Sequence, residues 1–482
     1  MVERSKEIKE KVVRRTLGVH LTSKEIFNDT IFPEIYENLT DYIWVDLYCG
    51  KGNLILPVLD SIPKDSRIKF FKKHIFLFDI QEEMVERCIE NAETYGIPFS
   101  LAKNNIKQRD NLASFPNNLK AKGLPIFHIT NPPYLYLGYI RKHRETQKHS
   151  KLFEGSNKGY QDLYQIAMIN DLRSGIENLI YIIPSNFLFG ASVSNKFRSD
   201  FLKYYNICKM IIFETKIFEY TGTNICIGFF KRKQVSKSEI IEFNGLKIKK
   251  KKEEIKKKYI LKPEYKYRAG SEFDEFLEKN QVKTPLNVNY YLLKKEVINN
   301  IGNNRVSVID ANNYKNNQYI KLDLEVNDKL KNKIESNILY VRTIDTGSRV
   351  GRAGLGIINE DLKVNGIYVS GNTYRTHPIQ IFLEPIITQQ DQILLKNYLN
   401  FVLERFREKL DSEFLTTYKY SNADYTRKYL GLTQVRSLIE TLPIINMDSE
   451  RKIVLNDLVT KEKFDEILLF LKKFKKKEDD YS

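Results

Sequence analysis

The tetrapeptide Asn131-Pro132-Pro133-Tyr134 contains the residue types that activate a planar amine. The side-chain oxygen of Asn131 and the backbone carbonyl of Pro132 can together accept both hydrogens of such an amine. These hydrogen bonds draw the nitrogen lone pair out of conjugation and direct it at an electrophile. Tyr134 offers an aromatic face for a flat ring, although the same residues would also form a plain turn with a surface tyrosine. The neighbouring motifs decide between these two interpretations.

A glycine-rich segment at residues 46–53 follows the strand-like sequence YIWV. Gly50 and Gly52 let the backbone approach a ligand closely, and the Asp46 carboxylate at the strand end suits an ammonium group. The segment lacks the third glycine of a dinucleotide-binding fingerprint. A nucleoside that carries an amino acid therefore fits this segment better than a pyrophosphate.

Three further residues are expected to complete a nucleoside site. Asp79 ends the strand-like sequence HIFLFDI, where an acid accepts hydrogen bonds from ribose hydroxyls in nucleotide-binding α/β sheets. In the alternative interpretation, Asp79 caps the helix that follows it. Asn105 and Ile106 are expected to bracket an adenine, with the amide on its edge and the isoleucine on its face.

The elements that position these residues alternate along the first 232 residues, where apolar strand-like runs are separated by helical stretches. This alternation is typical of a mainly parallel α/β sheet. Gly96 and Gly175 are predicted to end two of the helices. Because Asn131 follows the strand-like sequence PIFHIT, we expect it at the carboxyl end of a strand, where open α/β sheets bind ligands.

These motifs, in this order, resemble the gamma-class, TaqI-like adenine-specific DNA methyltransferases of restriction-modification systems. The sequence from Gly18 to Ser23 is similar to the opening G-x-x-x-T-P loop of that family, with Ser23 in place of the proline. The resemblance implies a Rossmann-like S-adenosylmethionine-dependent methyltransferase domain, followed by a C-terminal target-recognition domain of mixed α/β structure. The implied substrate is the 6-amino group of an adenine that is flipped out of double-stranded DNA.

The resemblance also implies a role for each matched residue. Those that bind S-adenosylmethionine would be Thr22 and Asp46 at its methionine end, Gly50 and Gly52 in the loop, Asp79 at the ribose, and Asn105 with Ile106 at the adenine. Those that bind and stack the target adenine would be Asn131, Pro132, Tyr134 and, as a second aromatic residue, Phe218.

The character of the sequence changes after Lys233, where lysine, asparagine and tyrosine become frequent. We expect a catalytic domain at residues 1–232, a basic linker or insertion at 233–260, and a DNA target-recognition domain at 261–482. The lysine run at residues 247–258 is interpreted as a solvated linker, with contact to the DNA backbone as the alternative. The arginines expected to contact DNA in the last domain are Arg342, Arg349, Arg352 and Arg375.

The composition agrees with a polyanionic partner, because the 482 residues carry a formal net charge of +17. The four cysteines form no CxxC pair and the six histidines are scattered, so neither a disulfide framework nor a metal site is expected. With no apolar run of the ~20 residues that a membrane span needs, we expect a cytoplasmic enzyme. We expect a monomer, because a monomer suits an enzyme that handles one flipped base at a time. Any cognate restriction endonuclease is expected to be a separate chain.

Three alternatives stay open at this point. The same tetrapeptide serves methylation of a protein glutamine amide or of RNA adenine, and a DNA-binding subunit could keep an inactive methyltransferase fold. The long basic C-terminal region favours double-stranded DNA as the substrate.

Overall fold

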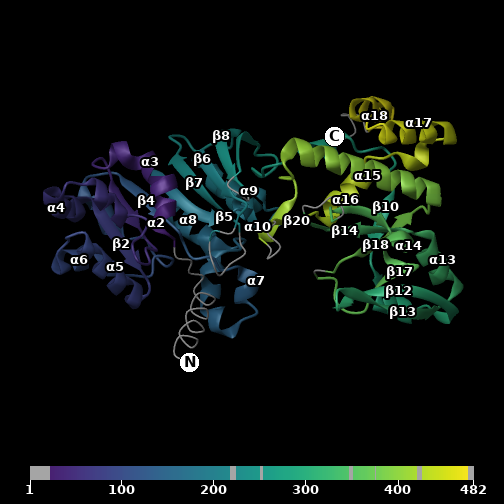
Figure 1. Cartoon of the computed structure of the whole chain (residues 1–482), viewed down its shortest axis with the longest axis horizontal. Helices are drawn as coiled ribbons and strands as arrows, with labels where there is room; N and C mark the ends of the chain where they lie inside the picture. The colour runs from purple at the N-terminus through teal and green to yellow at the C-terminus, as the bar shows by residue number, and fades with distance from the viewer. Residues whose placement is uncertain are drawn as a thin grey trace. The chain divides into compact units, whose positions relative to one another are not determined.

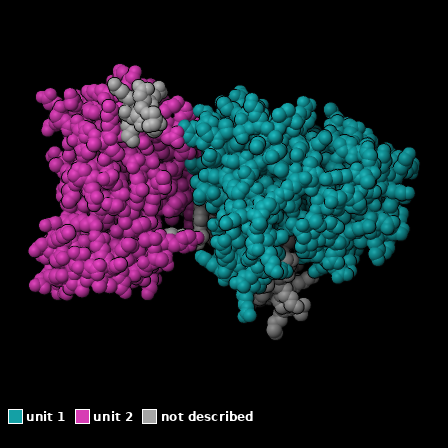
Figure 2. All heavy atoms as spheres, turned by 180° about the vertical axis from the view of Figure 1, so that it is seen from behind, with its two compact units in different colours: residues 1–269, 419–425 teal, residues 270–418, 426–482 magenta. Residues whose placement is uncertain are grey.

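The computed structural model of the chain describes residues 22–215, 217, 224–249, 253–346, 351–374, 376–420 and 426–475 (Figure 1). The chain divides into two compact units, which Figure 2 shows in different colours. Unit 1 contains Met1–Ala269 and Lys419–Tyr425, and unit 2 contains Gly270–Tyr418 and Thr426–Ser482. Each unit has its own hydrophobic core.

Unit 1 is built on a nine-stranded sheet with the strand order β3-β2-β1-β4-β5-β7-β6-β8-β9. The first five strands in this order are parallel, and β7 is antiparallel to both of its neighbours. The strands are β1 (Ile43–Asp46), β2 (Ile75–Asp79), β3 (Ile106–Gln108), β4 (Ile126–Thr130), β5 (Asn178–Pro184), β6 (Tyr205–Phe213), β7 (Ile225–Arg232), β8 (Ile241–Ile248) and β9 (Glu254–Leu261). This arrangement confirms the predicted Rossmann-like α/β class.

The central strands need cover on both faces because they are apolar and buried along their whole length; β1 and β2 contain no exposed residue. The longer helices of unit 1 are α4 (Lys64–His74), α5 (Glu82–Thr94), α6 (Phe99–Asn105), α8 (Leu163–Ser174) and α10 (Ser192–Leu202). Shorter ones are α2 (Lys24–Ile26), α3 (Phe32–Ile35), α7 (Leu137–Ile140) and α9 (Asn186–Phe189). The predicted stops are confirmed, since α5 and α8 end beside Gly96 and Gly175, both with positive φ.

Residues 233–260, which were expected to form a basic linker or insertion, contain strands β8 and β9 of the nine-stranded sheet. β8 pairs in parallel with β6, and β9 pairs with β8 in the antiparallel direction. Ile241, Phe243, Tyr259 and Leu261 are buried, whereas Glu242, Lys256 and Lys258 are exposed. The dense lysines hide this alternation in the sequence, and the boundary between the compact units lies at residue 269 rather than 232.

Unit 2 has the mixed α/β structure that was expected for the C-terminal region. One sheet has the order β10-β18-β14-β16 and contains β10 (Asn287–Tyr290), β14 (Leu339–Arg342), β16 (Gly354–Ile357) and β18 (Ile379–Glu384). Another has the order β11-β17-β12-β13 and contains β11 (Leu292–Leu293), β12 (Ile301–Lys315), β13 (Gln318–Val326) and β17 (Gly366–Val369). The smallest contains β15 (Ile344–Asp345), β19 (Thr416–Tyr420) and β20 (Thr426–Tyr429).

The longest described helix of unit 2 is α15 (Gln389–Leu410), which buries a row of apolar side chains in the core of that unit. The others are α11 (Glu272–Lys279), α12 (Lys294–Ile298), α13 (Asp328–Ser336), α14 (Ile358–Leu362), α16 (Leu432–Ile439), α17 (Ser449–Thr460) and α18 (Phe464–Leu471). In the parts of the chain that the structure describes, no helix combines the length and apolarity needed to cross a bilayer.

The fully buried guanidinium of Arg198 makes a testable contribution to the stability of unit 1. It donates hydrogen bonds to the carbonyl oxygens of Lys266 at 2.8 Å and Phe187 at 2.9 Å. Since Arg198→Met removes the donor from both carbonyls and leaves the buried one of Phe187 unsatisfied, we expect it to lower the free energy of unfolding by about 2–4 kcal/mol. Urea unfolding followed by the fluorescence of Trp44, the single tryptophan, measures the change.

The matched control for Arg198→Met is Lys196→Met on the same helix. Lys196 forms an exposed ion pair with Asp200, so its replacement is expected to change the unfolding free energy by less than about 1 kcal/mol. Equal losses in the two variants would contradict the assignment.

Candidate active site

A cavity at the carboxyl ends of β1, β2, β3 and β4 contains five of the predicted site residues. Thr22, Asp46, Gly50, Asp79 and Asn131 all line it. They come from separate segments of the chain, and they meet because parallel strands place their carboxyl ends at one edge of the sheet.

Asp46 is the most buried carboxylate in this cavity, with 1% of its surface exposed. Its Oδ1 accepts hydrogen bonds from Thr130 Oγ1 at 2.6 Å and from the backbone amide of Tyr48 at 3.0 Å. Burial raises the pKa of Asp46 to about 6, and the hydrogen bond from Thr130 opposes this rise. A cation that enters the cavity would therefore be attracted by Asp46 at neutral pH and would keep it ionised.

A buried histidine, His128, also contacts the backbone at the end of β1. His128 Nε2 accepts a hydrogen bond from the amide of Leu47 at 3.2 Å, so Nδ1 carries the ring hydrogen. Nδ1 donates it to Asp171 Oδ2 at 2.5 Å, and the Tyr181 hydroxyl donates to the same oxygen. The carboxylate of Asp171 thus fixes the ring that supports the residue next to Asp46.

The glycine-rich loop after β1 is fastened to the end of β2 by Asp79. The amide of Gly50 donates to Asp79 Oδ2 at 2.9 Å, and the amide of Gln81 donates to Oδ1 at 2.9 Å. Burial raises the pKa of Asp79, although these backbone hydrogen bonds oppose the rise. Gly52 has a φ of +79°, and a Cβ at this position would lie 2.6 Å from Leu56 Cδ1. The loop therefore requires glycine at position 52 for its backbone conformation and packing, while Gly50 is the glycine of this loop that lines the cavity.

Asn131 is held by contacts on both sides of its amide group. Its Nδ2 donates to Thr22 Oγ1 at 2.9 Å. The Tyr134 hydroxyl contacts Asn131 Oδ1 and the carbonyl oxygen of Ile182. These contacts orient the side chain whose oxygen was expected to accept a hydrogen from a planar amine.

Tyr134 and Pro132 lie differently from the surface turn considered as an alternative. Both are buried, and Tyr134 exposes only 9% of its surface. In this structure Tyr134 acts on the site through its hydroxyl, which positions Asn131, rather than by presenting an open aromatic face. Phe218 lies outside the described residues.

The structure does not bring Asn105 and Ile106 into the cavity. Asn105 Nδ2 donates to the carbonyl oxygens of Phe71 at 3.0 Å and Ile75 at 2.9 Å, which are at the opposite end of the sheet. Ile106 is the first residue of β3, so both residues precede this strand instead of following it. The prediction placed the site too early because β3 is only three residues long and mostly polar.

The residues that follow β3 occupy the expected place instead, and the sequence analysis missed them. Arg109, Asp110, Asn111 and Leu112 line the cavity. Asn111 Nδ2 donates to the carbonyl oxygen of Leu47 at 2.8 Å, while its buried Oδ1 has no hydrogen-bond partner among the described residues. The signal in the sequence was an Asp-Asn pair just after a short strand, comparable to the acids that end β1 and β2.

The comparison with protein families decides the class of this chain. The sequence profile described as N-6 DNA Methylase matches residues 18–321, which is more than half of the chain. The chain belongs to the N-6 DNA methylase family. No curated protein matches its sequence.

Solved structures agree with this N-6 DNA methylase fold. The chain is similar to the type IIL restriction-modification enzyme MmeI in complex with DNA, with a TM-score of 0.53 and 13% identity over 93% of this chain and 71% of that one. Two weaker similarities are to type I methyltransferase subunits. For the subunit from Streptococcus thermophilus the TM-score is 0.31, at 14% identity over 48% of each chain. For the EcoKI M protein it is 0.30, at 12% identity over 51% of this chain and 55% of that one.

The methylase chain thus spans about half the length of the two type I subunits. At these identities, the similarities describe the fold and not the activity.

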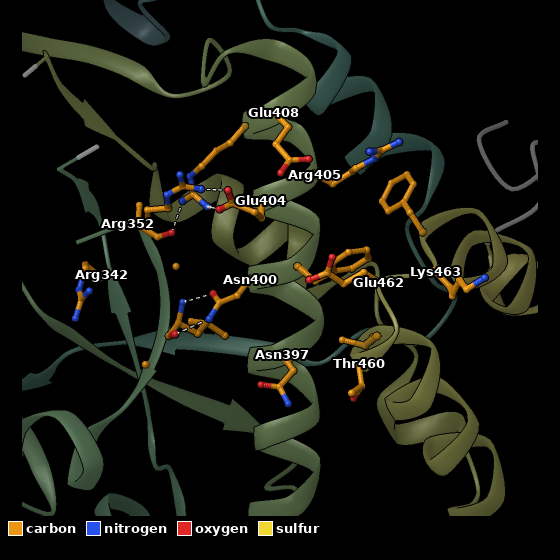
Figure 3. Close-up of a pocket in the computed structure, with 18 of the residues that line it drawn as sticks. Arg342, Arg352, Asn397, Asn400, Glu404, Arg405, Glu408, Thr460, Glu462 and Lys463 are labelled. Carbon is orange, nitrogen blue, oxygen red and sulfur yellow. Dashed lines mark hydrogen bonds and ion pairs between the residues drawn. The ribbon is translucent and has the colours of Figure 1, made fainter. Parts of the chain in front are cut away.

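Two of the arginines expected to contact DNA, Arg342 and Arg352, line a groove of about 1100 Å³ in unit 2 (Figure 3). Arg352 pairs with Glu404, which also pairs with Arg407 at 3.2 Å. The acidic groups that line the groove are Asp361, Glu404, Glu408, Glu462, Asp465 and Glu466. Because these acids offset the arginines and lysine in the lining, the groove is a poor surface for phosphates. Arg349 and Arg375 lie outside the described residues.

The hydrogen bond between Thr130 and Asp46 can be tested directly. Thr130→Val keeps the shape of the side chain but removes a donor that lowers the pKa of Asp46, so this pKa is expected to rise above about 6. Titration of Asp46 by carbon NMR of its carboxyl group measures the shift. Thr146→Val, at a buried threonine in a different segment, is the matched control. An unchanged titration of Asp46 in Thr130→Val would contradict the assignment.

Proposed function

We propose that this chain is a site-specific DNA methyltransferase. It transfers a methyl group from S-adenosylmethionine to the 6-amino group of an adenine that is flipped out of double-stranded DNA. The observation that carries the proposal is the position of Asn131, which lines the same cavity as Asp46 and Asp79. Membership of the N-6 DNA methylase family supports the choice of adenine nitrogen and of DNA.

The cavity has the polar groups that S-adenosylmethionine requires. Asp46 would bind the ammonium group, and Asp79 has lone pairs left for ribose hydroxyls after accepting two backbone amides. The Oδ1 of buried Asn111, which has no partner among the described residues, would accept a hydrogen from the 6-amino group of the cofactor's adenine, beside Asp110. The bound cofactor supplies an electrophilic methyl group. The chain's own residues therefore have to bind and orient.

Asn131 and the carbonyl of Pro132 would accept the two hydrogens of the target amine and so make its nitrogen nucleophilic. The Tyr134 hydroxyl keeps the Asn131 amide in place through its contacts with Oδ1 and with Ile182. Flipping the base costs a few kcal/mol, and stacking on aromatic side chains offsets this cost. The gamma-class resemblance implies that Phe218 and Tyr134 stack on the base. Because the ring of Tyr134 is buried in this structure, we assign the stacking to Phe218 and the positioning of Asn131 to the Tyr134 hydroxyl.

The finer parts of the proposal follow from the same resemblance. We assign the chain to the gamma class of a restriction-modification system, acting as a monomer without a metal ion. Any cognate endonuclease would be a separate chain. The alternative substrate for methyl transfer is a protein glutamine amide or RNA adenine.

Replacement of the amide is the first test of the proposed chemistry. Asn131→Ala is expected to lower kcat for methyl transfer to unmethylated duplex DNA by about 100-fold or more, as is typical when a group that stabilises developing charge is lost. Transfer of labelled methyl groups by the purified protein measures kcat, and calorimetry measures cofactor affinity.

The matched control for this test is Asn53→Ala in the same cavity. Asn53 Nδ2 donates to the backbone carbonyl of Thr22, so its loss is expected to raise the KM for the cofactor and to change kcat less. Transfer to RNA or to a peptide, but not to DNA, would replace the proposed substrate.

The raised pKa of Asp46 predicts how cofactor binding depends on pH. Above pH 6 the carboxylate is ionised and attracts the ammonium group, whereas below about 6 it becomes protonated. Affinity for S-adenosylmethionine is therefore expected to fall by up to about tenfold per pH unit below that value. Calorimetry between about pH 5 and 8 measures the profile.

Asp46→Asn is expected to flatten this profile, and Asp110→Asn, at an exposed acid that lines the same cavity, to keep it. If the slope persisted in Asp46→Asn, another group would bind the ammonium.

A further inference from the structure

The hairpin formed by β12 and β13 ends in an asparagine turn beside a surface loop of unit 2. Asn316 and Asn317 form the turn, with φ of +50° and +62°. β17 pairs in parallel with β12, so the residues that follow it reach the same end of the hairpin. We call residues 311–321 and 370–374 together the hairpin-loop element.

A buried carboxylate fixes the base of this element. Asp310 accepts hydrogen bonds from the amide of Asn312 at 3.0 Å, the amide of Ser370 at 3.4 Å and the side chain of Asn313. Although burial raises the pKa of Asp310, these hydrogen bonds hold it below its usual value. The register of the two strands shifts between Asp310 and Tyr314, so a β-bulge turns the tip away from the regular ladder.

Asn312 joins the hairpin to the loop with both ends of its side chain. Its Nδ2 donates to the carbonyl oxygen of Asn372 at 3.0 Å, and its Oδ1 accepts from the amide of Gly371 at 2.7 Å. Within the loop, Asn372 Oδ1 accepts from the amide of Tyr374 at 3.0 Å. The tip and the loop are therefore held in one arrangement by side chains of the chain itself.

This element presents two large aromatic side chains to solvent. Tyr314 is 56% exposed and Tyr374 is 65% exposed. The sequence of residues 311–321 and 370–374 contains no aspartate or glutamate, whereas it contains Lys315 and Lys321. The element thus differs from the groove around Arg352, where acidic side chains offset the basic ones.

We infer that the hairpin-loop element reads base edges in a groove of double-stranded DNA, with Tyr314 and Tyr374 in direct contact and Asn312 as a positioning residue. The inference rests on the proposed function and adds the residues that select the target sequence. The major groove is wide enough for a two-stranded β-ribbon, and hydroxyls and amides can pair with the donors and acceptors that it displays. A rigid tip loses little entropy on binding, and a tip without acids does not repel phosphates.

The test is methylation by the purified full-length Tyr314→Ala/Tyr374→Ala double variant. Reaction with unmethylated genomic DNA, followed by sequencing of the modified positions, gives the preferred sites. We expect kcat/KM on the wild-type site to fall at least about tenfold, with relaxed preference at one or more positions of the site. Asn312→Ala is expected to lower kcat/KM and to relax the site preference by a smaller amount. In both variants, the melting temperature and the affinity for S-adenosylmethionine are expected to stay at wild-type values.

The matched control is Arg305→Ala on strand β12 near the opposite end of the same hairpin, which is expected to keep the wild-type sites and rates. Wild-type sites and rates in the double variant would overturn the inference and leave the proposed function intact. Equal weakening on every DNA sequence would also overturn it, because the tyrosines would then act on the backbone. No transfer to DNA by the wild-type protein would overturn the proposed function itself.

Discussion

The carboxyl edge of the parallel strands is the constraint on which the rest of unit 1 depends. Asp46, Asp79 and Asn131 come from different parts of the sequence, and only the pairing of β1 with β2 and β4 brings them to one cavity. Asp79 then fastens the glycine-rich loop through the amide of Gly50, while Thr130 and the His128 ring hold the end of β1. Polar groups of the site are thus fixed by a buried hydrogen-bond network before any ligand binds.

The parts of the site that could be predicted from sequence lie directly after strongly apolar strands. Asp46, Asp79 and Asn131 each follow such a run, so their place at the sheet edge could be inferred without the structure. β3 gave no such signal, because Ile106 is its only apolar residue, and the site at Asp110 and Asn111 was therefore missed. The role of the Tyr134 hydroxyl depends on a contact with Ile182, which is 48 residues away in sequence.

The charged residues of the sequence were the least reliable basis for predicting local structure and DNA contacts. The lysine-rich segment after residue 246 looked like a linker, yet it contains the end of β8 and most of β9, which pair in the nine-stranded sheet. Arg352 looked like a mobile DNA contact, yet it pairs with Glu404 from a helix that begins 37 residues further along the chain. A sequence reports how many charges a segment carries, whereas their partners depend on the tertiary structure.

Analysis of the nucleosides in cellular DNA tests the central claim most directly. DNA from cells that express the wild-type chain or Asn131→Ala, in a host without adenine methylation of its own, would be digested and measured by mass spectrometry. The account predicts 6-methyladenine with the wild-type chain and its loss with Asn131→Ala. Absence of 6-methyladenine from the DNA, while the purified protein binds S-adenosylmethionine and methylates RNA or a protein amide, would contradict it.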